Sequence, residues 1–154
     1  MDNNDILRRL RYAFDFDDTT MISLFAQADY TVTRAEVSNW LKKEDHEEYV
    51  SLHDKQLATF LNGFINHKRG RREGPQPVPE KTLNNNLVLR KLRIALNYKD
   101  EDIIAVMELA GQRVSKPELS ALFRKPDHRH FRYCRDQFLR NFIHGLVKKY
   151  RPQG

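Results

Sequence analysis

Apolar residues return along the chain with the period of an amphipathic α-helix. Between Asn4 and Phe14 they form one face of a helix with 3.6 residues per turn, and basic residues occupy the other side. Later apolar segments have the same spacing and predict further helices over residues 19–28, from residue 33 onward, and over residues 49–67. The first 68 residues therefore predict a small four-helix domain.

The same pattern returns 82 residues later without a gap. NNDILRRLRYAF at Asn3 aligns with NNLVLRKLRIAL at Asn85, and LATFLNGFI at Leu57 aligns with LRNFIHGLV at Leu139. A match of this length indicates a duplication. We predict an all-α fold of two tandem four-helix copies related by a pseudo-two-fold axis. The copies span 1–68 and 84–151, and residues 69–83 form a flexible basic linker containing Pro and Gly.

The predicted helix starts carry capping residues. Thr33 with Glu36, and Ser115 with Glu118, have the spacing of a capping box, in which each side chain hydrogen-bonds a backbone N–H of the first turn. Short polar side chains also fit the starts of the first and second helices. The expected caps there are Asn3 or Asn4, Asp18 and Asp100.

A glycine occurs inside the fourth helix of both copies, at Gly63 and Gly145. Glycine within a helix costs about 0.5–1 kcal/mol relative to alanine. Its presence in both copies indicates that another backbone passes close by. We expect this contact to be the seam between the copies.

The second and third helices of each copy resemble a helix-turn-helix, in which polar residues of the third helix face the DNA major groove. The match is incomplete, because Gln27 and Thr31 stand where the motif usually has Ala and Gly. A generic helical hairpin, shaped by packing alone, explains the same spacing. In the first interpretation the groove-facing residues are Arg34, Ser38, Asn39, Lys42, Lys116, Ser120, Ala121 and Arg124.

Charge is distributed unevenly around a formal net charge of +6. Residues 1–66 carry −5, residues 67–83 carry +3 and residues 84–154 carry +8. A basic half favours contact with a polyanion, although opposite charges would also help the two halves to dock. The candidate phosphate-binding residues are Arg71, Arg72, Arg90, Lys91, Arg93, Lys116, Arg124, Lys125, Arg129 and Arg132.

Aromatic residues lie among these cations. Tyr133 and Tyr150 are candidates for stacking on unpaired bases, with packing in the core as the alternative. Phe131 is more simply interpreted as a core residue, because Tyr49 occupies its position in the first copy.

Histidine recurs in one short loop, as Asp45-His46 and Asp127-His128. The second copy adds His130 and Cys134, which would complete a metal-ligand set, but the first copy has Glu48 and Leu52 at those positions. A loop carboxylate that bonds nearby N–H groups explains the shared pair without a metal. We predict no metal and no cofactor.

Sequence motifs of catalysis are lacking: the chain has no phosphate-binding loop, no dinucleotide fingerprint and no recognisable pairing of a nucleophile with a base. We therefore expect a protein that is not an enzyme. One cysteine, no signal-peptide pattern and no long apolar run lead us to expect a cytoplasmic protein without a membrane partner.

The chain resembles the YehS-like family of bacterial proteins over nearly its whole length. The resemblance rests on the duplicated NN-x-x-LR-x-LR-x-A start, on the segment from Val37 to Asp45 (VSNWLKKED) and on Phe60-Leu61-Asn62-Gly63. It implies a bacterial, cytoplasmic protein with a duplicated domain. It implies no catalytic residues.

These observations favour a binding protein. The leading hypothesis is a non-enzymatic nucleic-acid-binding or regulatory module that uses the basic second copy and the linker to bind DNA or RNA. The alternative is a protein-interaction adaptor or a homodimer, in which the acidic copy of one chain meets the basic copy of another.

Overall fold

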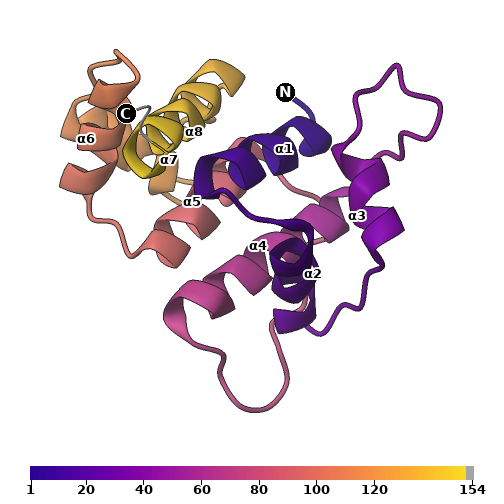
Figure 1. Ribbon diagram of the computed structural model, residues 1–154. Coiled ribbons are helices and arrows are strands. Elements are labelled where there is room, and N and C mark those ends of the chain that lie inside the picture. The colour runs from indigo at the N-terminus through magenta and orange to yellow at the C-terminus, as the bar shows by residue number, and fades with distance from the viewer. Residues whose placement is uncertain (152–154) are drawn as a thin grey trace.

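The computed structural model describes residues 1–151, and this range folds into eight α-helices without a strand (Figure 1). The first repeat contains α1 (Asn3–Phe14), α2 (Asp18–Gln27), α3 (Arg34–Leu41) and α4 (Asp54–Arg69). The second contains α5 (Asn85–Leu96), α6 (Asp100–Leu109), α7 (Lys116–Phe123) and α8 (Asp136–Tyr150). The all-α class and the duplication are confirmed. None of these helices has the length and apolar character needed to cross a membrane.

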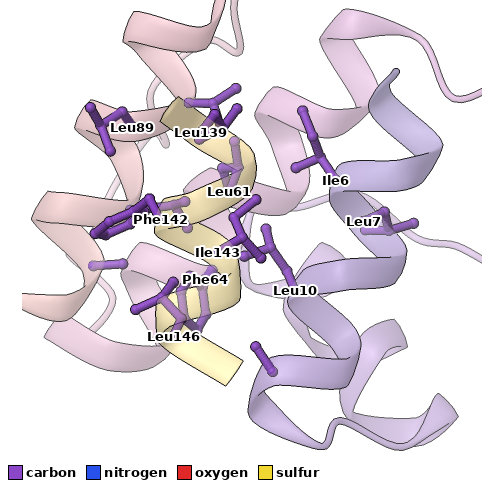
Figure 2. Close-up of a cluster of buried hydrophobic side chains, with 14 of the residues drawn as sticks. Ile6, Leu7, Leu10, Leu61, Phe64, Leu89, Leu139, Phe142, Ile143 and Leu146 are labelled. Atoms are coloured by element: carbon purple, nitrogen blue, oxygen red, sulfur yellow. The ribbon is translucent and has the colours of Figure 1, made fainter. Parts of the chain in front are cut away.

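The two repeats pack by exchanging helix partners. α1 lies against α8 of the second repeat, and α5 lies against α4 of the first repeat. This reciprocal pairing is the predicted pseudo-two-fold arrangement. Figure 2 shows side chains from α1, α4, α5 and α8 gathered in one cluster. Leu7, Leu61, Leu89 and Ile143 are fully buried there, so the repeats share a continuous core.

Within each repeat, the second helix packs on the fourth, and the helical glycines permit this contact. A Cβ atom on Gly63 would lie 1.7 Å from the carbonyl oxygen of Leu24 in α2. A Cβ atom on Gly145 would lie 2.2 Å from the carbonyl oxygen of Val106 in α6. The predicted close backbone is confirmed, but its placement at the seam is wrong, because each glycine faces a helix of its own repeat.

The helix starts differ from the expectation at three of the five helices for which a cap was predicted. Both predicted capping boxes of the third helices are present, at Thr33 and Ser115. α1, however, is capped by Asp2, whose side chain accepts from the N–H of Asp5 at 2.8 Å. α2 is capped by Asp17 rather than Asp18, and α6 begins after Lys99 rather than after Asp100.

Asn4 does not cap a helix; its buried side chain bonds two distant backbone segments. Its side-chain nitrogen donates to the carbonyl oxygens of Trp40 and Val50, both at 2.9 Å, and its oxygen accepts from the N–H of Leu52 at 3.0 Å. These bonds fix residues 50–52, which have no regular secondary structure. The fourth helix therefore begins at Asp54, not at Tyr49 as predicted, and its equivalent begins at Asp136, not at Phe131.

The segment between α4 and α5 has no regular secondary structure, but it contacts the first repeat at several points. Arg71 donates to the carbonyl of Gln27 and pairs with Asp29 at 2.6 Å. Glu80 pairs with Lys91 of α5 at 3.0 Å. The linker thus runs along the molecular surface and covers one side of the α4–α5 contact.

Candidate functional site

Four of the ten predicted phosphate-binding residues are held in contacts within the chain. Lys91 is buried at 9% exposure, where it pairs with Glu80 and donates to Asn62 at 2.7 Å. Lys91 stabilises the contact between the repeats and cannot reach a ligand in this structure. The other three residues pair with carboxylates: Arg93 with Asp100 at 3.0 Å, Lys116 with Glu101 at 2.9 Å and Arg71 with Asp29 at 2.6 Å.

Two further predicted residues are exposed and lie outside residues 124–135 in sequence. Arg90 is exposed on α5 and donates to the carbonyl of Phe123 at the end of α7. Arg72 is exposed in the linker. Neither makes an ion pair within residues 1–151.

The remaining four predicted residues come together on one irregular stretch, which we name the basic segment, residues 124–135. It contains Arg124, Lys125, Arg129 and Arg132, joined by Arg135, and all five are exposed. None of them has a carboxylate within ion-pair distance in the part of the chain that the structure describes. Their charge is therefore available to a ligand.

The first repeat provides an internal comparison. Its equivalent stretch, residues 42–53, has two basic and four acidic residues, whereas the basic segment has five basic and one acidic, so the formal charge changes from −2 to +4. In the first repeat Lys42 pairs with Glu48 at 2.7 Å, and this contact lowers the pKa of the Glu48 carboxyl. In the second repeat the corresponding residues are Arg124 and His130, so the cation loses its carboxylate partner.

A groove of about 980 Å³ lies between the basic segment, α7 and the start of α8. Its walls combine apolar side chains, from Pro117, Leu122 and Phe138, with the cations of the segment. Two replacements explain why space exists here. Leu122 and Gln112 stand where the first repeat has the larger rings of Trp40 and Tyr30, and both of those rings pack against Phe25 in the first repeat's core.

Asn86, the counterpart of Asn4, fixes the basic segment. It donates to the carbonyl oxygens of Leu122 at 3.0 Å and Arg132 at 2.9 Å, and it accepts from the N–H of Cys134 at 2.9 Å. Cys134 is buried, whereas its neighbour Tyr133 is 71% exposed. The equivalent of Tyr133 in the first repeat is Ser51.

The other predicted aromatic residues have structural contacts. Phe131 is half-buried, and its ring lies 4.9 Å from that of Tyr133 in an edge-to-face arrangement. Tyr150 packs against Phe14 of α1 at 5.0 Å and shares a hydrogen bond with Tyr98. Tyr150 therefore belongs to the seam between the repeats.

Most of the residues predicted to face a DNA major groove are paired within the chain or partly buried. Arg34 pairs with Asp18 at 3.3 Å, and Lys42 donates to Asn39 at 2.8 Å in addition to pairing with Glu48. Ser38, Asn39, Ser120 and Ala121 are half-buried. Of the eight residues, Arg124 is exposed and has no carboxylate partner within residues 1–151. The hairpins α2–α3 and α6–α7 thus present few available polar side chains.

The histidine loops are closed by local hydrogen bonds. The Nδ1 atoms of His46 and His128 accept from the backbone N–H groups of Glu48 and His130, both at 3.0 Å. Burial raises the pKa of the Cys134 thiol to about 12, with a further contribution from Asp136. No group of three potential metal-binding side chains is found between residues 1 and 151.

The structure has most of the predicted cations on the surface, with Lys91 buried and Arg93 half-buried, and the groove is not predictable from the sequence pattern alone. Pro117 and Phe138, which wall it, are ordinary apolar positions in sequence. The available signal was the loss of bulk at Gln112 and Leu122 relative to the first repeat. The role of Asn86 was also missed, although the Asn pair at the start of each repeat was visible.

Comparison with known proteins gives a family but no activity. The family model described as "Protein of unknown function (DUF1456)" matches twice, at residues 3–70 and 85–152. The chain is 43% identical over 148 residues to "Uncharacterized protein YehS" of Escherichia coli (strain K12), covering 96% of this chain and 95% of that protein. No solved structure matches.

Proposed function

The chain belongs to the family described as protein of unknown function (DUF1456), and from the surface of its second repeat we propose that it is a non-enzymatic nucleic-acid-binding module of the bacterial cytoplasm. The binding surface is the basic segment with the adjoining groove. The observation that carries this proposal is the change of charge from −2 to +4 between equivalent stretches of the two repeats.

The geometry supports a polyanionic ligand. The five cations lie within one stretch of twelve residues. Asn86 fixes the C-terminal part of this stretch by two hydrogen bonds, to Arg132 and Cys134, and bonds Leu122 just before it. Arginine guanidinium groups bind phosphate oxygens with two parallel hydrogen bonds. A group of exposed arginines without carboxylate partners in the described chain therefore suits phosphate groups, and each contact releases a counterion. The proposal uses neither α3 nor α7 as a recognition helix.

A second candidate function rests on the same comparison. The acidic stretch of the first repeat carries Glu44, Asp45 and Glu47, which have no ion-pair partner among the described residues. The acidic stretch of one chain can meet the basic segment of another, which would give head-to-tail self-association. This candidate predicts salt-sensitive oligomers rather than salt-sensitive binding of nucleic acid.

The test is a fluorescence-anisotropy titration of the full chain with labelled DNA and RNA, single-stranded and duplex, over a range of salt concentrations. With about four phosphate contacts, the logarithm of the binding constant should fall with the logarithm of salt concentration with a slope of about −3. The double variant Arg124→Glu, Arg132→Glu should bind at least about tenfold more weakly and reduce this slope by about two.

The matched control changes the charge equally in the first repeat. Lys43 and Lys55 are exposed and unpaired within residues 1–151, so Lys43→Glu, Lys55→Glu alters the net charge by the same amount. The control should change affinity by no more than about twofold, because screening weakens distant charges. Equal losses in both variants, or no binding of any nucleic acid, would contradict the proposal. Salt-sensitive oligomers in the absence of such binding would favour the second candidate.

A further inference from the structure

We infer that the groove of the second repeat receives unpaired nucleotides of a single strand, with Tyr133 as the stacking platform. This inference rests on the proposed function and specifies its ligand. It concerns which form of nucleic acid fits the groove. It is supported by the exposure of Tyr133, by the mixed apolar and cationic groove walls, and by the charged contacts of α7.

Tyr133 is a preorganised aromatic surface. The Asn86 side chain bonds the carbonyl of Arg132 before it and the N–H of Cys134 after it. The ring of Phe131 supports it from one side at 84°. An exposed ring held in this way loses little entropy when a base stacks on it. Base stacking on aromatic side chains is the common feature of single-strand recognition.

The groove combines the two environments that a single strand requires. Leu122, Pro117 and Phe138 supply apolar walls for the faces of bases, while Arg124, Arg132 and Arg135 supply cations for the phosphates. Its volume of about 980 Å³ lies at the upper end of the usual range for ligand sites. In duplex nucleic acid the base faces are stacked on each other and cannot enter such a groove.

The contacts of α7 argue against a duplex at the same place. Lys116, at its start, is paired with Glu101. Glu118 lines the groove, and the hydrogen bond from Ser115 lowers the pKa of its carboxyl, so it stays anionic. A helix inserted into a major groove commonly directs its N-terminal residues at bases and phosphates. An anionic Glu118 would repel the phosphates of a duplex there, whereas a single strand can place its phosphates on the arginine side.

The first repeat lacks this site. Ser51 and Val50 replace Tyr133 and Arg132, and Tyr30 occupies the position of Gln112. Each chain should therefore bind one strand at one site. This asymmetry also supplies a matched control, because Ser51 is the structural equivalent of Tyr133 on the same molecule.

The test uses the full chain and DNA and RNA oligonucleotides of about 12 nucleotides, each carrying one 2-aminopurine, as a single strand and as a duplex. Binding is followed by anisotropy, and stacking by the change in 2-aminopurine fluorescence. Wild type should prefer the single strand by about tenfold. Tyr133→Ala should weaken single-strand binding by about tenfold and abolish the fluorescence change. Tyr133→Phe should retain both, and Ser51→Ala should leave both unchanged.

The outcomes separate the inference from the proposed function. Suppose that duplex binds as well as single strand, or that Tyr133→Ala has no effect, while Arg124→Glu, Arg132→Glu still weakens binding by at least about tenfold. The stacking inference is then overturned and the proposed function stands. If neither form binds to folded wild-type protein, as judged by circular dichroism, both are overturned.

Discussion

Replacing Gly63 by alanine tests whether the approach of α4 to α2 is as close as the structure indicates. The new Cβ atom would lie 1.7 Å from the carbonyl oxygen of Leu24 and 2.7 Å from its carbonyl carbon. Both are backbone atoms, so no side-chain rotation relieves the clash. The two helices must separate by at least 1.3 Å before the Cβ–oxygen distance reaches 3.0 Å.

This separation determines how much the free energy of unfolding decreases in Gly63→Ala. A gap of about 0.5–1 Å already removes a quarter to a half of the dispersion energy between packed atoms. The side chains affected include Phe25 of α2 and Phe60 of α4, whose rings lie 5.3 Å apart in the core. Overpacking usually costs about 1–3 kcal/mol, and a backbone clash belongs at the upper end. Alanine returns about 0.5–1 kcal/mol of helix propensity, so we expect a net loss of about 2 kcal/mol in the free energy of unfolding.

Urea denaturation measures this loss. Trp40 is the single tryptophan, is 2% exposed and lies 5.4 Å from Phe25, so its fluorescence reports on the affected core while circular dichroism reports on both repeats. Gly145→Ala should cost less, because its clash distance is 2.2 Å and one of its close neighbours is the movable side chain of Val106. Ser23→Ala, on the exposed side of α2, is the propensity control and should stabilise slightly. A Gly63→Ala protein as stable as wild type would refute the reasoning.

Two further predictions concern Cys134 and the shared core. Burial raises the pKa of the Cys134 thiol in the folded protein to about 12, from an ordinary value near 9. The contribution of the protonated thiol to the free energy of unfolding is therefore complete below about pH 8 and declines above pH 9. Between pH 8 and pH 10 wild type should lose about 1 kcal/mol more in the free energy of unfolding than Cys134→Ala does, as chemical denaturation at the two pH values would show; equal losses would contradict this. Residues 84–151 alone lack α1 and α4, which cover α8 and α5 in the full chain. The exposed faces of α5 and α8 should therefore pair with α8 and α5 of a second copy, and light scattering should find a homodimer. A folded monomer would count against the shared core.

The elements that local patterns specify were predictable from sequence. The boxes at Thr33 and Ser115 depend on residues three positions apart, and the apolar face of α1 depends on its own periodicity. The pairing of helices across the repeats was not predictable in the same way. Periodicity identifies the face that is buried, but it does not identify the helix that covers it.

The errors at the site share one physical cause, which is that a side chain's availability depends on distant residues. Lys91 has the same sequence character as Arg124, yet Glu80 and Asn62 hold it in the seam. Asn4 is a residue type typical of a helix N-cap, yet its side chain donates to the carbonyl oxygens of Trp40 and Val50, far along the chain. By contrast, the five cations of the basic segment lie within twelve residues of the sequence, and so their grouping could be predicted.

The duplication offers a physical route by which this fold can carry the proposed binding surface while its framework is retained. Asn4 and Asn86 make equivalent bonds, and Gly63 and Gly145 allow equivalent helix contacts, so the framework of both repeats is retained. At the positions between these anchors the repeats diverge. The first fills its space with Trp40 and Tyr30 and pairs Lys42 with Glu48, whereas the second opens a groove and leaves Arg124 unpaired within the described chain. Because the helices are exchanged, the well-packed first repeat covers α5 and α8 and thereby supports the repeat that carries the groove.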